Sequence, residues 1–378
     1  MSRIGILGGG QLARMLVLAG APLGLRFLVL DAAEGACAAE LAPQLKADYR
    51  DEEALARFAG EVDVATFDFE NVPADSAEWL ATRVPVHPAP RALAVAQDRM
   101  AEKTLFSELG IPVPPFAPVD SRRSLDAALA HVGVPAILKT RRFGYDGKGQ
   151  FRLRSGADAD AAWAALGAAQ GGLILEGFVP FDREISVVAV RGRDGAFRAW
   201  PIGENWHVDG VLSATLAPAV VDAALARRAL DHARRVAEAV DYVGVFALEL
   251  FVRDGEVLAN EMAPRVHNSG HWTIEGAETS QFENHLRAVL GLPLGAVDAR
   301  GWSCMLNWIG AMPTRDAVLA EPGGHWHDYG KTPRVGRKVG HATLRAETPE
   351  ALAAVLERVG RALAREAQVA PVLARLRS

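Results

Sequence analysis

Residues 139–150 combine positive charge with closely spaced glycines, a pattern suited to binding a polyphosphate. Lys139 ends an apolar run, and the loop after it adds Arg142 and Lys148. Backbone amides exposed by glycine, together with cations, stabilise transferring phosphoryl oxygens, so the segment is typical of a flexible lid over phosphates. An ordinary hairpin with solvated lysines is the alternative. A P-loop is excluded, because GxxxxGK(S/T) does not occur.

Two carboxylates in otherwise apolar strands indicate a cation site. Glu249 interrupts an apolar run, and Asn260 and Glu261 end the next one. A carboxylate in such a strand is costly to bury unless it is paired or binds a cation. Hard oxygen ligands on adjacent strands suit Mg²⁺ that bridges phosphates. Buried ion pairs, to Arg265 for example, are the alternative, and the glycine-rich loop upstream favours the metal.

Two further polar runs have residue types that bind anions. The first, at residues 265–272, gathers Arg, His, Asn and Ser directly after the carboxylates and is suited to orienting a small anion. The second, at residues 327–338, has four cations within eight residues, interleaved with glycine and proline. It is either a solvated charge run or a clamp for a phosphate monoester, and its lack of helical spacing favours the clamp.

The elements that must position these residues begin with βα units. Residues 3–7 form an apolar strand, residues 8–10 are Gly-Gly-Gly, and residues 11–19 have helical spacing. Asp31 ends the next strand, roughly 20 residues on, where a dinucleotide site has its ribose carboxylate. Parallel α/β sheets often carry such turns without a dinucleotide, because the amides of any helix N-terminus attract an anion. Both hypotheses remain open here.

The rest of the chain predicts further strands and helices. Glu249 and Glu261 fall on an expected hairpin of strands 245–251 and 257–261. Other strands are expected at 26–30, 62–67, 111–118, 136–139, 173–176, 184–191, 303–308 and 341–345. Helices are expected at 99–109, 125–131, 223–240 and 280–290, with the final helix at 349–363. The alternation of strands and helices at the start predicts a parallel sheet with ligands at the strand C-termini.

Length and composition exclude several classes of protein. The chain has 378 residues, 50% hydrophobic and 23% charged, which at about 100–200 residues per domain indicates two or three domains and no dominant disorder. Lys+Arg 41 against Asp+Glu 46 gives a net charge of −5, so we expect no nucleic-acid and no membrane partner. Two cysteines cannot build a disulfide framework, and no signal peptide or spanning run is recognised, which predicts a cytoplasmic location.

Together these motifs resemble those of ATP-grasp enzymes and, over essentially the full length, those of the N5-carboxyaminoimidazole ribonucleotide synthetase family of purine biosynthesis. The motifs that carry the resemblance are GGGQLARM (8–15), FENVP (69–73), GYDGKGQ (144–150), NEMAPRVHNSGHWT (260–273) and GRKVGH (336–341). The third and fourth are highly specific to that family. The resemblance implies a mixed α/β and α+β fold: a Rossmann-like domain at 1–97, an ATP-grasp domain with the glycine-rich lid at 98–297 and a small C-terminal domain at 298–378.

The resemblance also implies a reaction and its partners. ATP and bicarbonate would carboxylate the exocyclic amine of 5-aminoimidazole ribonucleotide through carboxyphosphate, with release of ADP and phosphate. Mg²⁺ would accompany ATP, and the family implies a homodimer. Because carboxyphosphate is readily hydrolysed, the glycine-rich lid would serve to exclude water.

The site residues of the family correspond to positions in this sequence. Those implied for ATP are Arg99, Lys139, Gly144, Tyr145, Asp146, Gly147, Lys148, Gly149, Gln150, Glu176, Gly177, Phe178, Val179, Glu184, His207, Asn260 and Glu261. Within this set, residues 176–179 would contact adenine through the backbone, and Glu184 would contact the ribose. Those implied for Mg²⁺ are Glu249 and Glu261. Those implied for catalysis around bicarbonate and carboxyphosphate are Arg265, His267 and Asn268, with Asp146 and Lys148 of the lid. Those implied for the ribonucleotide are Glu70, Tyr145 and Asp146 at its ring and Lys331 and Arg337 at its phosphate.

Three alternatives remain. Another ATP-grasp ligase, such as the formate-dependent glycinamide ribonucleotide transformylase or a biotin carboxylase subunit, is disfavoured by the HNSGHW run and the short C-terminal part. An NAD(P)-dependent oxidoreductase would use residues 8–10 and Asp31, but it leaves the lid and the two carboxylates without a role. A non-enzymatic nucleotide-binding regulator would be expected to have lost Lys139, Glu249 or Glu261, and all three are present.

Overall fold

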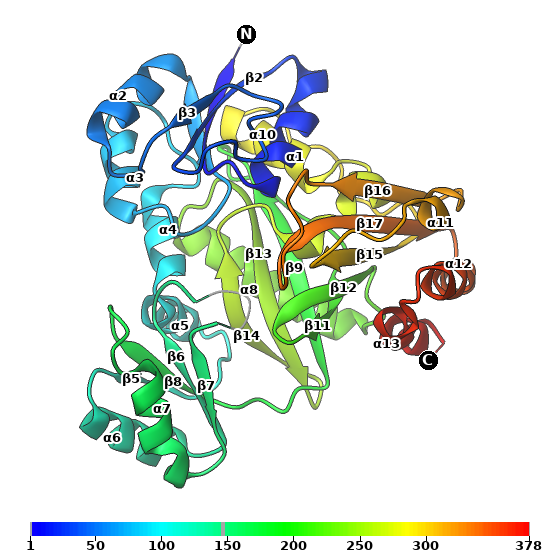
Figure 1. Cartoon of the computed structure of the whole chain (residues 1–378). Coiled ribbons are helices and arrows are strands. Elements are labelled where there is room, and N and C mark those ends of the chain that lie inside the picture. Colours follow the sequence, from blue (N-terminus) through cyan, green and yellow to red (C-terminus); the bar gives the residue numbers. More distant parts are fainter. Residues whose placement is uncertain (1, 145–147, 378) are drawn as a thin grey trace.

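The N-terminal unit of the computed structural model is a parallel sheet surrounded by helices, and the structure describes residues 2–144 and 148–377 (Figure 1). Its strands are β1 (Arg3–Leu7), β2 (Arg26–Asp31), β3 (Gln44–Lys46) and β4 (Val64–Phe67). Its helices are α1 (Gln11–Gly20), η1 (Ala21–Leu23), α2 (Glu52–Glu61), α3 (Ala74–Ala81) and α4 (Pro90–Gln97). The strand order is β3-β2-β1-β4, and β1 pairs in parallel with β2 and β4. The predicted parallel sheet is confirmed.

A second unit, at the lower left of Figure 1, is a four-stranded antiparallel sheet in the order β5-β8-β6-β7. Its strands are β5 (Phe116–Val119), β6 (Ala136–Thr140), β7 (Gln150–Leu153) and β8 (Leu173–Gly177). Its helices are α6 (Arg122–Val132), η2 (Gly156–Asp158) and α7 (Ala159–Leu166). Leu125, Leu138 and Leu175 are fully buried in a core of its own. The glycine-rich segment connects β6 to β7, and α5 (Arg99–Glu108) joins this unit to the first.

A nine-stranded antiparallel sheet forms the centre of the molecule. Its strands are β9 (Arg183–Arg191), β10 (Phe197–Ala199), β11 (Gly203–Val208), β12 (Val211–Ala217), β13 (Gly244–Arg253), β14 (Glu256–Ala263), β15 (Trp302–Ile309), β16 (Gly324–Asp328) and β17 (Lys338–Ala346). The order is β14-β13-β9-β11-β12-β15-β17-β16, with β10 paired to β9. The helices of this part are α8 (Ala223–Ala239), η3 (Asn268–Gly270), α9 (Thr273–Gly276), α10 (Gln281–Leu290), α11 (Asp316–Leu319), α12 (Pro349–Ala362) and α13 (Glu366–Leu376).

β13 and β14 form the predicted hairpin at the edge of this sheet. Glu249 and Glu261 are register partners, which places their side chains next to each other on one face. The register shifts after Glu249, so that Leu250 pairs with Ala259 and Asn260 is an extra residue on β14. The bulge therefore lies between the two carboxylates and the rest of the hairpin.

One hydrophobic core spans the N-terminal unit and the central sheet. Leu16 of α1 and Leu286 of α10 belong to the same cluster of buried side chains. A side chain at Gly20 would collide with the Phe27 ring of β2 and lie 3.1 Å from Leu286 of α10, so glycine at this position lets α1 pack closely against β2. Apolar packing thus sets how the first unit sits on the rest.

The C-terminal strands extend the central sheet. β15 pairs with β12, so the sheet continues across residue 298 without a break. Leu344, Leu352 and Val372 form a core between this part of the sheet and the helices α12 and α13. The helix expected at 349–363 is present as α12, but the prediction that it is the final helix was wrong, because α13 follows with Pro371 inside it. Proline usually marks a helix end, which hid α13 in the sequence.

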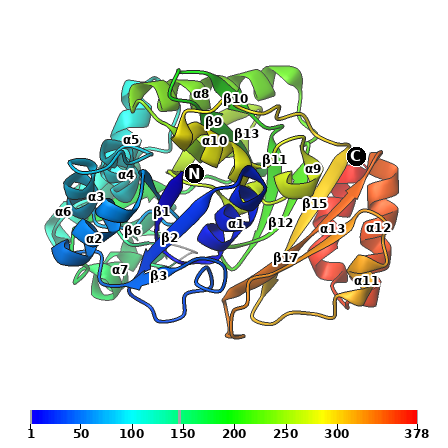
Figure 2. The ribbon, with the colours of Figure 1, turned by 90° about the horizontal axis from the view of Figure 1, so that it is seen from above.

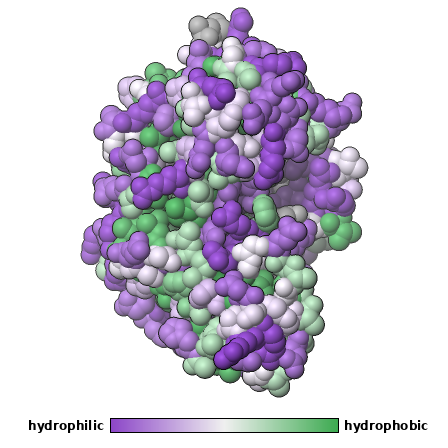
Figure 3. All heavy atoms as spheres, turned by 90° about the vertical axis from the view of Figure 1, so that its left-hand side faces the viewer, coloured by the Kyte–Doolittle hydropathy of each residue, from purple (hydrophilic) through white to green (hydrophobic). Residues whose placement is uncertain are grey.

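The units surround a common centre. Seen from above, β1, β2 and α1 lie between α2–α4 on one side and the C-terminal strands β15 and β17 on the other (Figure 2). The face formed by the left side of Figure 1 is mostly hydrophilic, with hydrophobic residues across its middle (Figure 3). Within the described ranges, no helix has both the length and the apolar character needed to cross a membrane.

Candidate active site

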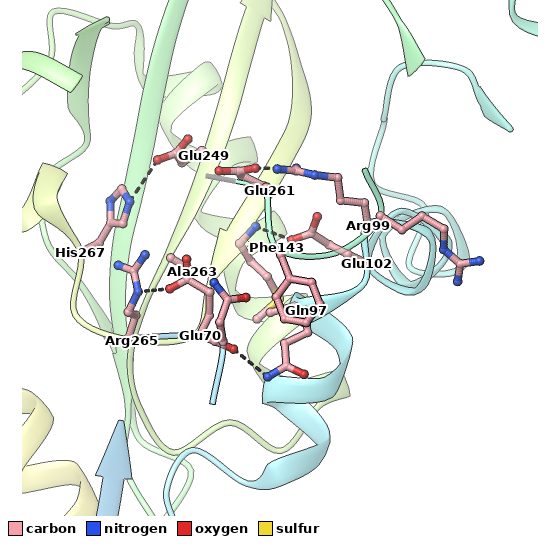
Figure 4. Close-up of a pocket in the computed structure, with 15 residues that line it drawn as sticks. Glu70, Gln97, Arg99, Glu102, Phe143, Glu249, Glu261, Ala263, Arg265 and His267 are labelled. Atoms are coloured by element: carbon pink, nitrogen blue, oxygen red, sulfur yellow. Dashed lines mark hydrogen bonds and ion pairs between the residues drawn. The ribbon is translucent and has the colours of Figure 1, made fainter. Parts of the chain in front are cut away.

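A pocket opens where the N-terminal unit, α5 and the β13–β14 edge of the central sheet meet (Figure 4). The charged side chains in its lining include Glu70, Arg99, Glu102, Glu249, Glu261 and Arg265. His267 from the first polar run lines it too, as do Phe143 and Gly144 at the start of the glycine-rich segment. The fold therefore brings the lid segment, the carboxylate pair and the first polar run into one pocket.

The two carboxylates singled out in the sequence lie side by side and differ in pKa. Arg99 Nη1 donates to Glu261 across 2.7 Å, and although burial opposes it, the Arg99 charge lowers the pKa of Glu261. Burial and the charge of Glu261 instead raise the pKa of Glu249 to about 7. His267 Nε2 lies 3.2 Å from a Glu249 oxygen. A cation between the carboxylates would relieve this excess of negative charge.

The donor set fits a Mg²⁺ ion that is held partly by its substrate. Among residues 2–144 and 148–377, no group of three or more His, Cys, Asp or Glu side chains is arranged to hold a metal ion. Glu249 and Glu261 would therefore supply the carboxylate ligands by themselves. This matches phosphate sites, where Mg²⁺ is bound through one or two carboxylates and completes its octahedron with phosphate oxygens and water.

Lys139 belongs to a buried network behind the pocket. Its Nζ lies 3.0 Å from Glu176 Oε2, and Lys103 Nζ lies 3.5 Å from the same oxygen. Burial would raise the pKa of Glu176, but the two lysine charges lower it to about 2. Lys103 also donates to the carbonyl oxygens of Asn260 at 2.6 Å and Ala259 at 3.3 Å. The network connects β6, β8 and α5 to β14, the strand that carries Glu261.

The glycine-rich segment approaches the pocket from β6 and β7. A side chain at Gly144 would lie 3.6 Å from Arg99 Nη2, and Gly149 has a φ of 69°, a conformation that favours glycine. Lys148 is exposed, and Gln150 begins β7 opposite Lys139. Three residues expected at the ligands lie outside the described residues, namely Tyr145, Asp146 and Gly147.

The segment expected at adenine connects the small sheet to the central one. Glu176 and Gly177 end β8, and Phe178 and Val179 follow in the connection to β9. The N–H of Gly177 donates to the Pro115 carbonyl at 2.8 Å, and that of Phe178 donates to the Pro135 carbonyl at 3.0 Å. These two N–H groups therefore hold the connection in place, and they are not available to a ligand.

Glu184 and His207 form a pair further along the same face of the central sheet. His207 Nδ1 lies 2.7 Å from Glu184 Oε2. Burial lowers the pKa of His207, but the hydrogen bond and charge of Glu184 outweigh it and raise that pKa. Ser186 is the register partner of Glu249, so Glu184, two residues away on β9, points to the carboxylate face.

Arg265 pairs with Glu70, the residue expected at the ribonucleotide ring, and with neither of the two carboxylates of the hairpin. Burial would raise the pKa of Glu70, but the charge and hydrogen bond of Arg265 lower it. Gln97 Nε2 holds the same turn by donating to the carbonyl oxygens of Glu70 at 2.7 Å and Val72 at 2.6 Å. The N-terminal unit thus contributes Glu70 to the pocket through contacts with distant segments.

His267 and Asn268 continue the first polar run into η3. The backbone N–H of His267 donates to Gln281 Oε1 at 2.9 Å. Burial and the positive charge of Arg265 hold the pKa of His267 well below its usual value, so this imidazole is neutral. Asn268 exchanges two side-chain hydrogen bonds with Asn307 of β15.

The second polar run forms the loop between β16 and β17, beside the start of α1. Lys331 Nζ donates to Gln11 Oε1, and burial lowers the pKa of Lys331. Arg337 Nη1 donates to the carbonyl of Thr332 at 3.1 Å. The expected phosphate clamp therefore faces the glycine turn of the N-terminal unit.

The protein's own carboxylates occupy that glycine turn. Asp31 accepts the Gly9 N–H at 2.7 Å, and Asp68 accepts the Ala13 N–H at 3.4 Å. Gly8 has a φ of 100°, and a side chain there would lie 2.0 Å from Asp68 Oδ1. Burial raises the pKa of Asp68 to about 6, against the effect of the N–H groups. A pyrophosphate at the start of α1 would meet this carboxylate, which argues against the dinucleotide hypothesis.

Sequence reasoning missed several residues at or near the pocket, namely Gln97, Glu102, Lys103 and Asn307, and it singled out Lys338 only as one of the four cations of the second polar run. Glu102 accepts the Met262 N–H at 2.6 Å, and the charge of Lys338 helps to lower the pKa of His267. A signal for two of them was present, because Glu102 and Lys103 share the buried stripe of α5 with Phe106. Charged residues on the apolar stripe of a helix call for partners.

Comparison with known proteins shows which family the chain resembles. Models of three families match the chain: the ribonucleotide synthetase preATP-grasp domain at residues 1–97, the ATP-grasp domain at 104–282 and the phosphoribosylaminoimidazole carboxylase C-terminal domain at 303–355. The N5-carboxyaminoimidazole ribonucleotide synthase of Pseudomonas aeruginosa is 55% identical over 343 residues, which are 91% of this chain and 94% of the relative.

Solved structures agree over nearly the whole length. The N5-carboxyaminoimidazole ribonucleotide synthetase of Thermus thermophilus is 55% identical, with a TM-score of 0.91 and coverage of 95% of this chain and 98% of that one. The synthase of Aspergillus clavatus, solved with ADP and 5-aminoimidazole ribonucleotide, is 31% identical, with a TM-score of 0.88 and coverage of 96% and 99%. The chain therefore belongs to the N5-carboxyaminoimidazole ribonucleotide synthase family of ATP-grasp enzymes.

Proposed function

We propose that the chain carboxylates the exocyclic amine of 5-aminoimidazole ribonucleotide with ATP and bicarbonate, and releases N5-carboxyaminoimidazole ribonucleotide, ADP and phosphate. One observation carries the proposal. A single pocket joins Arg99 and the Glu249–Glu261 pair, which suit a metal-bound phosphate chain, to Arg265 and His267, which suit a small anion. Membership of the family, and the ADP and ribonucleotide bound to the Aspergillus relative, support the same substrates.

The residues at one end of the pocket suit ATP. Arg99 and Lys139 carry the positive charge, and in this structure their partners are Glu261 and Glu176. Glu249 and Glu261 would hold Mg²⁺, which supplies charge neutralisation at the β- and γ-phosphate oxygens. Glu184 is proposed to bind the ribose, and the hydrogen bond from His207 would orient its carboxylate.

The residues at the other end suit bicarbonate and its phosphorylated form. A bicarbonate oxygen attacks the γ-phosphorus, the bond to the ADP oxygen breaks, and carboxyphosphate forms. Arg265 provides a fixed guanidinium for the carboxyl group, and the neutral imidazole of His267 lines the same part of the pocket as a hydrogen-bonding group. The amine then takes up the carboxyl carbon, phosphate leaves, and the amine proton passes to phosphate.

The ribonucleotide would lie between the N-terminal unit and the C-terminal loop. Glu70, with Tyr145 and Asp146 of the lid, is proposed for its ring. Lys331 and Arg337 are proposed for its phosphate, and Lys331 already stands beside Gln11 at the start of α1. Held this way, the ribonucleotide ring would lie beside the Glu70–Arg265 pair.

Several organisational features belong to the same proposal. The domain boundaries at 97/98 and 297/298 divide the chain into a Rossmann-like part, the ATP-grasp part with its lid and the C-terminal part. Residues 98–297 would carry the nucleotide, and the other two parts would carry the ribonucleotide. The homodimer and the cytoplasmic location stay predictions.

The experiment that tests the function is ADP release by the purified protein with Mg²⁺, ATP and bicarbonate, with and without 5-aminoimidazole ribonucleotide. We expect turnover that requires the ribonucleotide and yields an acid-labile carbamate. ADP release that is indifferent to the ribonucleotide would keep the grasp chemistry and reject the acceptor. The lack of ADP under every condition would reject the ligase.

A further inference from the structure

Asn307 makes contacts that the proposed reaction does not yet use. It lies on β15, and its side chain is almost completely buried, with 2% of the residue exposed. Asn268 Nδ2 donates to Asn307 Oδ1 at 3.1 Å, and Asn307 Nδ2 donates to Asn268 Oδ1 at 2.6 Å. The two amides therefore form a closed pair of hydrogen bonds between residues 39 positions apart in the chain.

The orientation of this pair is fixed from the Asn307 side. Asn307 Nδ2 also donates to the carbonyl oxygen of Leu212 on β12 at 2.8 Å. Because only the amide nitrogen can donate there, Asn307 Oδ1 must face Asn268. Asn268 in turn must present its nitrogen to Asn307 Oδ1 and its oxygen to Asn307 Nδ2.

The support behind Asn307 is rigid. β15 is paired on both sides, with β12 and with β17, and Asn307 lies opposite the buried His341 in the second pair. Gln368 of α13 donates to the carbonyl oxygens of Asn307 at 3.1 Å and Ser213 at 3.0 Å. The C-terminal strands and the last helix therefore fix the position of Asn307, whose side-chain amide binds Asn268.

We propose that Asn307 is a positioning residue for the bicarbonate end of the pocket. It acts by fixing the side-chain rotamer of Asn268, and with it the start of η3 next to His267. The inference rests on the proposed function, in which Asn268 lies beside bicarbonate and carboxyphosphate. It gives the C-terminal strands a second role besides the phosphate clamp. If the start of η3 were free to move, the pocket would bind bicarbonate weakly and water would reach carboxyphosphate.

The test compares Asn307→Ala and Asn268→Ala, singly and combined, with the wild-type chain. Initial rates are measured at varied bicarbonate, ATP and ribonucleotide, together with the ratio of ADP released to carbamate formed. For Asn307→Ala we expect a KM for bicarbonate raised about tenfold and an ADP-to-carbamate ratio above that of the wild type. The KM values for ATP and the ribonucleotide should stay within about twofold, because neither substrate depends on Asn268 for its position.

The double variant distinguishes a loss of Asn268 positioning from a general disturbance of the fold. If Asn307 acts through Asn268, the combined variant is no worse than Asn268→Ala alone. Additive losses, or equal rises in all three KM values, would overturn the proposal. Met305→Ala, a buried residue on the same strand and the same face, is the matched control and should lower the melting temperature without changing the KM for bicarbonate.

A second Asn307 variant and the turnover of the wild-type protein complete the test. Should Asn307→Ala fail to fold by circular dichroism, Asn307→Leu keeps the side-chain volume without a buried charge and removes both hydrogen bonds to Asn268, and the same rise in the KM for bicarbonate is expected from it. Wild-type protein without ribonucleotide-dependent turnover would reject the proposed function. Wild-type turnover combined with an unchanged KM for bicarbonate in the Asn307 variants would reject this inference alone.

Discussion

At the residue scale, the main feature of the pocket is a pair of neighbouring carboxylates whose pKa values are shifted in opposite directions. Glu261 is ionised and paired with Arg99, whereas burial and the charge of Glu261 raise the pKa of Glu249 to about 7. Two carboxylates in register on adjacent strands are costly unless something positive joins them. Their placement is therefore better explained by a cation-binding role than by stability.

Glu261→Gln tests that role. The amide keeps the shape and removes one of the two proposed Mg²⁺ ligands, so we expect kcat to fall about 100-fold or more and the Mg²⁺ concentration for half-maximal rate to rise. The measurement is ADP release across a Mg²⁺ titration. Glu256→Gln, at the exposed start of the same strand, is the control and should match the wild type. A Glu261→Gln variant with normal turnover would remove the metal assignment.

At the element scale, α5 holds in place the edge strand β14, which carries Glu261. β14 has no further strand beyond it in the sheet order, and the bulge at Asn260 interrupts its pairing with β13. Lys103 and Glu102 of α5 take up the carbonyl of Asn260 and the N–H of Met262. Two buried ionisable side chains thus hydrogen-bond to the edge strand where it bends to place Glu261.

Lys103→Met tests this attachment. The change leaves the carbonyl of Asn260 without its donor and removes one of the two lysines near Glu176, so we expect a loss of about 3 kcal/mol in the free energy of unfolding and a KM for ATP raised about tenfold. Thermal unfolding and initial rates measure both effects. Ser107→Ala, one turn along the same helix, should cost little. A Lys103→Met protein as stable as the wild type would contradict the attachment.

At the scale of the whole molecule, His285 connects the N-terminal unit to the central sheet. Its Nδ1 accepts the Val245 N–H of β13 at 3.0 Å, and its Nε2 lies 2.7 Å from Thr66 Oγ1 of β4. The imidazole is therefore neutral and carries its proton on Nε2. Burial lowers the pKa of His285 to about 3. A proton on Nδ1 would break the contact with β13.

This contact predicts a specific sensitivity to acid. In the unfolded chain His285 titrates near 6.5, so its contribution to stability is complete above that pH and is lost progressively as the pH falls toward the folded pKa of about 3. At pH 5.5 the loss amounts to about 1.4 kcal/mol for this one group. We expect the stability difference between His285→Gln and the wild type to move by that amount in favour of the variant between pH 7.5 and pH 5.5.

Thermal melting at both pH values checks it, with a matched control. Leu286 is buried on the same helix as His285 and does not titrate, so the stability difference between Leu286→Ala and the wild type should not depend on pH. A pH-independent difference for His285→Gln would show that the imidazole is protonated in the fold or exposed to water. The difference between variant and wild type isolates His285 from the other buried histidines.

The sequence alone predicted many of the longer elements and the family to which the chain belongs. The βα start, the β13–β14 hairpin and the glycine-rich loop are encoded by local patterns of spacing, as are the residue types of the two polar runs. Strands β11 and β12 were not predicted, although β11 carries His207, because their short alternation is weak beside the surrounding signals. Pro371 hid α13 for the reason given above.

Only the tertiary structure decided which of those residues meet. Arg265 pairs with Glu70 across 195 positions, and Lys103 reaches Asn260 across 157. Asn307 meets Asn268 because β15 joins the central sheet beside β12. Local spacing determines helices and strands, since those depend on near neighbours. Partner choice among buried charges depends on how distant elements pack, and a single sequence carries no direct record of it.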